Sequence, residues 1–237
     1  MILERKSKLN VLEIKNQYSD LLAFLPKTKD GIDGIDELIA LINLLNVYSG
    51  AMKEVSTKLE ILNNEYQTRH AHNPIHHIER RVKDLRSLVR KMHRKDLPIT
   101  SKAARENIYD IAGIRVVCNY KHDSHHLAEM LLQQEDIELV EKVDYINQPK
   151  TNGYRSLHLI VTVPVFLTSG VEKIPVEIQF RTIGMDMWAS LEHKLNYKTN
   201  SSLDENALQE LIECSDELSQ IEDKMQRIFD QIYDESE

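Results

Sequence analysis

Positive charge, cysteine and membrane-type apolar segments are all scarce in this sequence of 237 residues. The formal net charge of −8 argues against indiscriminate binding of nucleic acids, because such binding needs positive charge, at least in a local concentration. The two cysteines, Cys118 and Cys214, lie in an alternating apolar run and in a helical pattern. We therefore interpret both as buried thiols, expect no disulfide, and expect a cytoplasmic protein.

The sequence predicts neither a signal peptide nor a membrane-spanning segment. The stretch MILERKSKLN is charged at positions 4, 5, 6 and 8 and lacks the apolar core of a signal peptide. The uncharged run Ser156–Gly170 contains Pro164 and β-branched residues, so it indicates a strand rather than a membrane span. An apolar content of 41% and a charged content of 29% are ordinary for a globular protein of this length.

Two long segments show the seven-residue repeat of coiled-coil-like packing. Between Ile35 and Tyr66, and again near the C-terminus, apolar side chains recur in alternating steps of three and four. The seams consist of Leu38, Leu41, Leu45, Tyr48, Met52, Val55, Leu59, Leu62 and Tyr66, and of Leu211, Cys214, Leu218, Ile221, Met225, Ile228 and Ile232. Such a seam packs either on the chain's own core or on another copy. Two seams in one modest chain favour a helix-mediated homo-oligomer.

The centre of the chain mixes helices with strands. In DIAGIRVVCNY, the alternation of Ile114, Val116 and Cys118 with their neighbours predicts a strand over 114–119, entered through Gly113. The other expected elements are helices over 76–95, 101–108, 124–134 and 183–198 and strands over 137–145, 155–165 and 173–181. This order predicts an α+β fold in which a mixed sheet packs with helices and long helices flank it at both ends.

The segment 76–95 concentrates positive charge on an acidic chain. Within Glu79–Lys95, eight lysines and arginines stand against two acids. On a continuous helix, apolar residues share one face, and the opposite face carries Arg80, Lys83, Arg86, Ser87, Arg90, Lys91 and Arg94. That basic face is either a solvated surface or a polyphosphate site, where several cations converge on closely spaced negative charges.

Two of the expected strands bring acids close to an apolar core. In VEIQFRT, the residues Val176, Ile178 and Phe180 point one way, and Glu177, Gln179 and Arg181 point the other way. Asp110 stands just before the strand 114–119, and Arg115 lies on the polar side of that strand. If both strands share a sheet, Asp110 and Glu177 converge on one face. Mg²⁺ on a nucleotide typically takes one or two protein carboxylates, which this pair supplies.

The stretch PKTNGYRSLHL, residues 149–159, places a glycine turn, an aromatic ring and basic side chains directly before a strand. Gly153 lets the backbone turn sharply and leaves Tyr154 at the edge of the sheet. The ring is either a structural part of the loop or a stacking surface for a base, which is worth roughly 1–3 kcal/mol per base. The polar neighbours available to a nucleotide are Lys150, Asn152, Arg155 and His158.

Four stretches in sequence order, DIAGIRVV, NGYRSLH, VEIQFRT and MDMWASLEHKLNYK, resemble the synthetase domain of the RelA/SpoT alarmone enzymes. HNPIHHIERRVKDLRSLVRK is similar to the RelP-type branch of the small alarmone synthetases, and the resemblance covers about residues 50–230. It implies a nucleotidyltransferase-like fold and Mg²⁺-dependent transfer of the β,γ-pyrophosphate of ATP to the 3′-hydroxyl of GDP or GTP. It also favours a homotetramer, and no membrane or DNA partner is expected.

The resemblance implies roles for individual residues, carried over motif by motif. Asp110 and Glu177 are expected to bind Mg²⁺, and Glu177 to activate the 3′-hydroxyl. The ATP-binding residues are expected to be Arg81, Lys83, Ser87, Lys91, Arg94 and Arg115, with Arg81 and Arg115 on either side of the adenine. The GDP/GTP-binding residues are expected to be Lys150, Asn152, Tyr154, His158, Gln179 and Arg181, with Tyr154 stacked on guanine. The expected division is an oligomerisation segment over 1–75, a catalytic core over 76–200 and an oligomerisation helix over 201–237.

Some features depart from this pattern or remain open. Phe180 stands where the family pattern has an aliphatic residue, and on an inward face it changes packing only. His122 and Asp123 are expected in a surface loop, and no alarmone hydrolysis is expected. The histidines His70, His72, His76 and His77 indicate either a Zn²⁺ site or a polar helix junction. The alternatives to an enzyme are a non-catalytic nucleotide- or RNA-binding oligomer and a helical scaffold, which leaves the polar strand faces unexplained.

Overall fold

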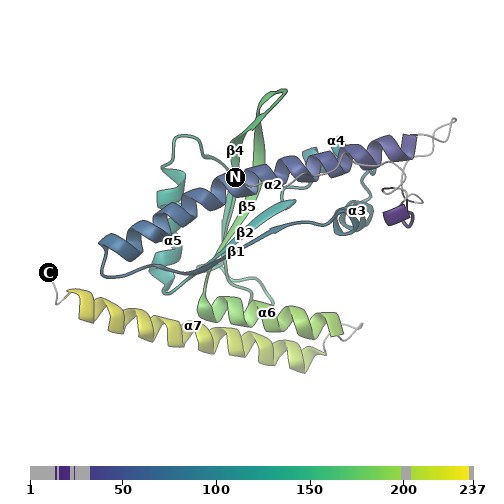
Figure 1. Cartoon of the computed structure of the whole chain (residues 1–237). Helices are drawn as coiled ribbons and strands as arrows, with labels where there is room; N and C mark the ends of the chain where they lie inside the picture. The colour runs from purple at the N-terminus through teal and green to yellow at the C-terminus, as the bar shows by residue number, and fades with distance from the viewer. Residues whose placement is uncertain (1–13, 15, 22–23, 25–32, 199–203, 235–237) are drawn as a thin grey trace.

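A computed structural model describes residues 14, 16–21, 24, 33–198 and 204–234 (Figure 1). Its elements are α2 (Asp33–Arg69), β1 (Ile75–Val82), α3 (Leu85–Arg94), α4 (Ser101–Asn107), β2 (Ala112–Cys118), α5 (Lys121–Leu132), β3 (Glu138–Asp144), β4 (Leu157–Leu167), β5 (Gly170–Thr182), α6 (Ile183–Lys198) and α7 (Glu205–Asp234). The predicted α+β class and the long helix at each end are confirmed.

The five strands form one mixed sheet in the order β1-β2-β5-β4-β3. β2 and β5 run parallel, and the other neighbouring pairs are antiparallel. The parallel pair places Gly113 opposite Glu177 and Arg115 opposite Gln179. The condition for convergence of Asp110 and Glu177, a sheet shared by their two strands, is therefore met.

Alternation along the strands gives the sheet an apolar face and a polar face. On β5, Ile178 and Phe180 are fully buried, whereas Glu177 and Gln179, which alternate with them, are half-buried. Helix α2 crosses the sheet in Figure 1 and belongs to the same apolar core as Ile178 and Phe180. Phe180 thus has the inward position that its place in the pattern predicts.

The apolar stripe of α2 covers this core. Leu38, Leu41, Tyr48, Val55 and Leu59 have no exposed surface, and α2 contacts β1, β2, β4 and β5. Among the described residues, α2 is the one helix whose length and composition are those of a membrane span. Because its buried residues pack on the sheet, the first seam is explained by packing on the chain's own core.

The expected helix over 76–95 is wrong in its first half. Residues 75–82 form β1, which pairs antiparallel with β2, and α3 begins only at Leu85. The Asp84 side chain caps α3 by accepting a hydrogen bond from the backbone N–H of Ser87 at 2.9 Å. Pairing with β2 supplies the backbone hydrogen bonds of β1, so tertiary context overrides the helical spacing of the apolar residues.

This correction divides the basic residues between two faces of the sheet. Arg80 donates a hydrogen bond to Glu60 of α2 at 2.8 Å. Arg81, its neighbour, pairs with Gly113 of β2 and points away from α2. The basic face expected on one continuous helix therefore does not exist: Lys83 lies between β1 and α3, and α3 carries Arg86, Arg90, Lys91 and Arg94.

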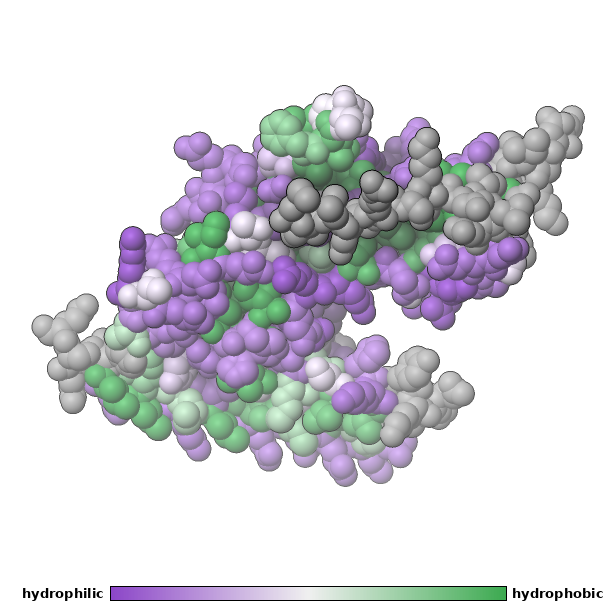
Figure 2. Space-filling view, in the orientation of Figure 1, coloured by the Kyte–Doolittle hydropathy of each residue, from purple (hydrophilic) through white to green (hydrophobic). Residues whose placement is uncertain are grey.

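Helices α6 and α7 lie side by side below the sheet in Figure 1. Trp188 of α6 donates its indole N–H to the backbone carbonyl of Leu211 on α7 at 2.8 Å. Much of the second seam is uncovered: Ile221, Met225, Ile228 and Ile232 are 50–62% exposed. Figure 2 shows apolar residues along these lower helices. The two seams share one spacing, yet within the described chain only that of α2 is covered.

The two cysteines are free thiols, as the sequence predicts. Cys118 on β2 is buried, but Cys214 on α7 is exposed, so the prediction of burial is wrong for Cys214. A helical apolar repeat indicates one face of a helix without showing that another element covers it.

The loop predicted for His122 and Asp123 is also wrong, and the predicted surface position is right for His122, which is exposed, but wrong for Asp123. Both residues lie in the first turn of α5 rather than in a loop, and Asp123 is only 6% exposed. Its carboxylate accepts a hydrogen bond from the backbone N–H of Tyr120 at 3.0 Å and lies 3.0 Å from His72 Nε2. Asp123 therefore caps the start of α5 and ties it to the segment before β1.

Candidate active site

A cavity of about 620 Å³ opens on the polar face of the sheet. Residues of β1, β2 and β5 and the positions just after β1 and before β2 line it. The lining residues are Glu79, Arg80, Arg81, Lys83, Asp110, Gly113, Ile114, Arg115, Glu177 and Gln179. The cavity thus brings together both predicted metal ligands and three of the predicted ATP-binding residues.

Asp110 lies between two lysines at this cavity. Its Oδ2 accepts hydrogen bonds from Lys83 Nζ at 2.8 Å and from Lys91 Nζ at 2.5 Å. Burial raises the pKa of Asp110, but the hydrogen bonds and charges of the two lysines outweigh burial and hold this pKa below its usual value. Its Oδ1 is buried and has no hydrogen-bond partner among the described residues. An ionised carboxylate with one free oxygen suits a hard cation.

Glu177 faces the same cavity from β5. Its Oε1 lies 3.6 Å from His158 Nδ1, and its Oε2 accepts a hydrogen bond from Gln179 Nε2 at 3.0 Å. Burial raises the pKa of Glu177 and so does the charge of Asp110, but His158 and Gln179 stabilise the carboxylate and the pKa lies below its usual value. The two carboxylates are therefore ionised and close enough to repel each other, a repulsion that a shared cation relieves.

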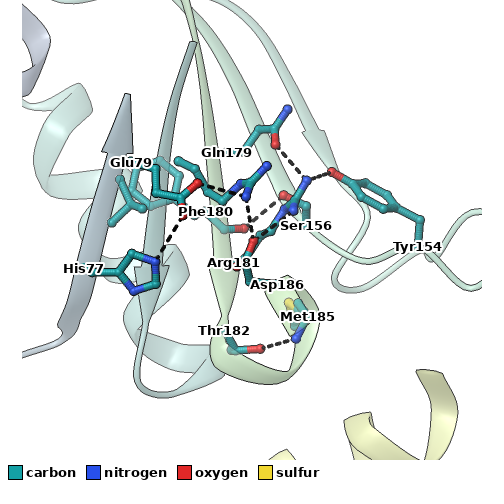
Figure 3. A network of polar contacts seen from close by, with 12 residues as sticks. His77, Glu79, Tyr154, Ser156, Gln179, Phe180, Arg181, Thr182, Met185 and Asp186 are labelled. Carbon is teal, nitrogen blue, oxygen red and sulfur yellow. Dashed lines mark hydrogen bonds and ion pairs between the residues drawn. The ribbon is translucent and has the colours of Figure 1, made fainter. Parts of the chain in front are cut away.

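Tyr154 belongs to a closed ring of polar contacts beside Glu177. Its hydroxyl lies 2.8 Å from His158 Nε2 and accepts a hydrogen bond from Arg181 Nη2 at 2.8 Å. Arg181 Nη2 also donates to Gln179 Oε1 at 2.8 Å, and Gln179 in turn contacts Glu177. Figure 3 shows Tyr154 at the turn with its hydroxyl directed toward Arg181. The aromatic side chain of Tyr154 is half-buried, so one part of it remains accessible to a ligand.

The turn before β4 has the shape that its glycine predicts. Gly153 has a φ of +89°, in the region that favours glycine, and its backbone carbonyl accepts a hydrogen bond from Ser215 Oγ of α7. Asn152 Oδ1 accepts the backbone N–H of Tyr154 at 3.2 Å, and Lys150 Nζ lies 5.0 Å from the centroid of that ring. The turn thus holds Tyr154 beside Lys150 and Asn152, two of the polar neighbours predicted for the same site.

Comparison of the sequence with known proteins identifies the family of this chain. A family model described as a region found in RelA / SpoT proteins matches residues 80–202. GTP pyrophosphokinase YwaC of Bacillus subtilis (strain 168) is 46% identical over 179 residues, which cover 76% of this chain and 85% of the relative. The chain belongs to the RelA/SpoT family.

Solved structures of RelA/SpoT relatives share the fold. The small alarmone synthetase 1 from Bacillus subtilis bound to its product pppGpp has a TM-score of 0.74 and 35% identity, and the match covers 80% of this chain and 96% of that chain. The small alarmone synthetase 2 from the same organism has a TM-score of 0.71 and 43% identity, with coverage of 79% and 97%. The resemblance drawn from the sequence motifs is confirmed.

Not every residue predicted for this RelA/SpoT family member lies at the cavity. The hydroxyl of Ser87 donates to Asp84 Oδ2 at 2.7 Å, and Arg94 is exposed in the last turn of α3. Arg155, grouped with the turn from the sequence, instead donates to Asp216 of α7 at 2.8 Å. These side chains are held by, or lie on, other parts of the surface.

Two acids at the site were missed from the sequence. Glu79 Oε2 and Asp186 Oδ1 each lie 3.1 Å from Arg115 Nη1. Glu79 is an exposed acid in a basic segment, and Asp186 is an acid in the first turn of a helix, which the helix dipole alone explains. Strand register identifies the first of them, because Glu79 pairs with Arg115 across β1 and β2.

The histidine cluster shows the features of a polar junction. His76 Nδ1 lies 2.7 Å from His77 Nδ1, and His72 contacts the carboxylate of Asp123. In the part of the chain that the structure describes, no three His, Cys, Asp or Glu side chains are grouped so as to hold a metal ion. The geometry favours the junction interpretation.

Proposed function

We propose that this chain is a (p)ppGpp synthetase that transfers the β,γ-pyrophosphate of ATP to the 3′-hydroxyl of GDP or GTP and releases AMP. The observation that carries the proposal is one site with two ionised carboxylates, lysines on one side of them and a half-buried tyrosine ring on the other. A relative named a GTP pyrophosphokinase and a structural neighbour bound to pppGpp as its product support the reaction.

The donor ATP is proposed to lie along β1, β2 and α3. Arg81 and Arg115 sandwich the adenine, a role that suits planar guanidinium groups. The phosphates are bound by the cationic side chains of Lys83, Lys91 and Arg94 and accept a hydrogen bond from the hydroxyl of Ser87. Supporting this placement, the ammonium groups of Lys83 and Lys91 already meet at one carboxylate oxygen, so a phosphate oxygen of the same charge can replace it.

Mg²⁺ is the proposed cofactor, held by Asp110 and Glu177. The donor set fits the ion, because both carboxyl pKa values are lowered and Asp110 Oδ1 is a buried oxygen without a partner among the described residues. When bound, Mg²⁺ supplies positive charge that neutralises the phosphates during transfer.

The acceptor nucleotide is proposed to lie at the turn before β4. Tyr154 stacks on guanine, and the pocket residues are Lys150, Asn152, His158, Gln179 and Arg181. Glu177 accepts the proton of the 3′-hydroxyl while the bond from O3′ to the β-phosphorus forms. The bond from that phosphorus to the oxygen bridging to the α-phosphorus breaks, and AMP leaves with the oxygen. The lowered pKa of Glu177 keeps it ready to accept the proton at neutral pH.

The proposed assembly is a homotetramer in the cytoplasm, without a membrane or DNA partner. The uncovered stripe Ile221, Met225, Ile228 and Ile232 supports self-association through the C-terminal segment 201–237. An oligomerisation role for 1–75 and a catalytic core over 76–200 complete the proposed division, although α2 itself shares the core of the sheet.

The test is direct. Purified protein is incubated with Mg²⁺, γ-labelled ATP and either GDP or GTP, and products are separated chromatographically. Label in a guanosine tetra- or pentaphosphate is expected, and Glu177→Gln is expected to lower its formation by roughly 10²–10⁴-fold with the fold retained. Bound nucleotide without labelled product in the wild type favours the alternative, a non-catalytic nucleotide- or RNA-binding oligomer. Near-normal turnover by Glu177→Gln removes Glu177 from its role.

A further inference from the structure

One carboxylate oxygen joins the two arginines of the site that belong to different strands. Asp186 Oδ1 lies 3.1 Å from Arg115 Nη1 and 3.1 Å from Arg181 Nη1. The Asp186 side chain is 16% exposed, and that of Arg181 is 6% exposed. In Figure 3, Asp186 lies beneath Arg181, between the residues of β1 and β2 and the turn of Tyr154. Asp186 thus connects two halves of the polar network.

The position of Asp186 follows from the topology. Parallel pairing sets Arg115 of β2 opposite Gln179 and Val117 opposite Arg181 of β5. β5 ends at Thr182 and α6 begins at the next residue, so the first turn of α6 lies at the ends of both strands. The backbone N–H of Met185 donates to Thr182 Oγ1 at 3.3 Å, which fixes that turn. A side chain from this turn reaches both arginines.

The two arginines depend on Asp186 for both charge and orientation. Arg115 has one other acid contact, to Glu79, and Arg181 donates its remaining hydrogen bonds to Tyr154 and Gln179. The Nε atoms of both arginines are buried and have no partner among the described residues. The plane of each guanidinium is therefore set by its terminal nitrogens, and Asp186 contacts both: it accepts a hydrogen bond from Arg181 and forms an ion pair with Arg115.

We propose that Asp186 is a positioning residue for both nucleotides, an inference that rests on the proposed function. It touches neither substrate. Its carboxylate holds the plane of Arg115 for the donor base and holds Arg181 against the hydroxyl of Tyr154, which aligns the ring for the acceptor base. Removing the charge leaves two partly buried guanidinium groups to repel each other and to turn. Binding of donor and acceptor therefore weakens together, although the two bases lie on opposite sides of the carboxylate.

The test uses Asp186→Asn in the full-length protein. We expect the KM for ATP and the KM for GDP each to rise about tenfold, which corresponds to about 1.4 kcal/mol, because each arginine loses a charged partner. The turnover number is expected to change by less than about threefold, since Asp186 does not contact the reacting atoms. The matched control is Glu172→Gln, which removes the charge from the carboxylate of another arginine pair, Arg105–Glu172, neither residue of which lines the cavity. The control is expected to leave both KM values unchanged.

Calorimetric binding of GDP and of a non-hydrolysable ATP analogue, each measured alone, provides a second readout that does not need turnover. Asp186→Glu retains the charge and is expected to bind both nucleotides more tightly than Asp186→Asn does. The proposal is overturned if only one nucleotide binds more weakly, or if turnover and thermal stability fall while both affinities stay at the wild-type value. It is also overturned if Asp186→Glu binds no better than the asparagine variant. A wild type that binds both nucleotides without forming product refutes the proposed function, yet the binding comparison still decides the role of Asp186.

Discussion

Replacing Asp110 with asparagine tests the electrostatic arrangement of the cavity. Asp110 Oδ2 accepts hydrogen bonds from Lys83 and Lys91, whose side chains are only 12% and 21% exposed. A hydrogen bond to a charged group contributes about 1.5–3 kcal/mol, and the asparagine oxygen retains a weaker, neutral bond to each ammonium. We expect Asp110→Asn to lower the free energy of unfolding by about 2–3 kcal/mol. For a chain of this size the corresponding decrease in Tm is roughly 5–10 °C.

The same substitution is expected to separate ATP binding from turnover. Without the carboxylate, the ammonium groups of Lys83 and Lys91 are free to contact phosphate, so ATP binding in the presence of a chelator is expected to be equal or tighter. Pyrophosphate transfer with Mg²⁺ is expected to fall by a factor of about 100 or more, because a metal ligand worth several kcal/mol is lost. Lys91→Met is the opposing control, and it is expected to weaken binding in the chelator.

Calorimetry with EDTA, thermal unfolding and the labelled-product assay together decide this prediction. Asp110 is inferred to compete with phosphate for the two lysines. This idea is contradicted if Asp110→Asn still unfolds in one transition but binds ATP more weakly than the wild type in the presence of EDTA. Turnover within about threefold of the wild type contradicts its role as a metal ligand.

Three further substitutions test other parts of the site. Tyr154→Ala is expected to raise the KM for the guanine nucleotide by roughly 5–100-fold, from the value of one stacked base, and an equal loss of ATP affinity contradicts the stacking role. Gly153→Ala places a Cβ 3.1 Å from Ser215 Cβ at a φ of +89°, so Tm is expected to fall and the KM for the guanine nucleotide to rise. An unchanged KM disproves the idea that the turn positions the ring of Tyr154. Glu222 accepts the backbone N–H of Gly184, and burial raises its pKa, so the stability it contributes is present at low pH and is lost as pH rises through that raised value. Glu222→Gln is therefore expected to gain in Tm relative to the wild type between pH 4 and pH 8, and a relative loss over that range refutes the assignment.

The strands that carry the site were predictable because their two faces differ in chemistry. On β2 and β5, apolar residues at every second position point into a buried core, and the polar residues between them include Arg115, Glu177 and Gln179. Once the segment is known to be a strand, a period of two determines which side chains face the core and which face the other side of the sheet. The same pattern places Glu177 on the polar face, and it predicts that Asp110, just before β2, converges with Glu177 if the two strands share a sheet, which they do.

β1 was not predictable by the same argument. Its apolar residues Ile78 and Val82 are four apart, and Leu85, Val89 and Met92 of α3 continue that spacing, so the whole segment reads as one amphipathic helix. Hydrogen bonding to β2 decides between the two structures, and the paired residues of β2 lie 30 to 43 positions further along the chain. Local spacing contains no information on such pairing.

The two seams show a second limit of sequence patterns. Leu41, Val55 and Leu59 of α2 and Ile221 and Ile228 of α7 obey the same alternating steps, yet the first set is buried and the second set is exposed. The pattern establishes that one face of each helix is apolar. The identity of the covering surface depends on where the loops carry the helix, which the spacing does not specify.

Asp186 could not be predicted for a related reason, since its partners come from the two strands of the fold's parallel pair, which are far apart in the sequence. In the sequence it is one acid among the apolar residues of MDMWASL, and a helix start is an ordinary place for an acid. Only the meeting of Arg115 and Arg181 at one oxygen distinguishes it.

The pairing of charges at the site also explains how an acidic protein selects a small polyanion. Lys83 and Lys91 already contact Asp110, and Arg115 and Arg181 already contact Asp186. Positive charge is therefore present in neutralised form and projects little long-range attraction, in agreement with a net charge of −8. A ligand gains from the lysines only where its phosphate replaces the carboxylate of Asp110, and its bases must fit beside Tyr154 and the arginines that Asp186 holds in place. A flexible nucleic acid lacks that arrangement of groups, so geometry rather than net attraction determines what the site accepts.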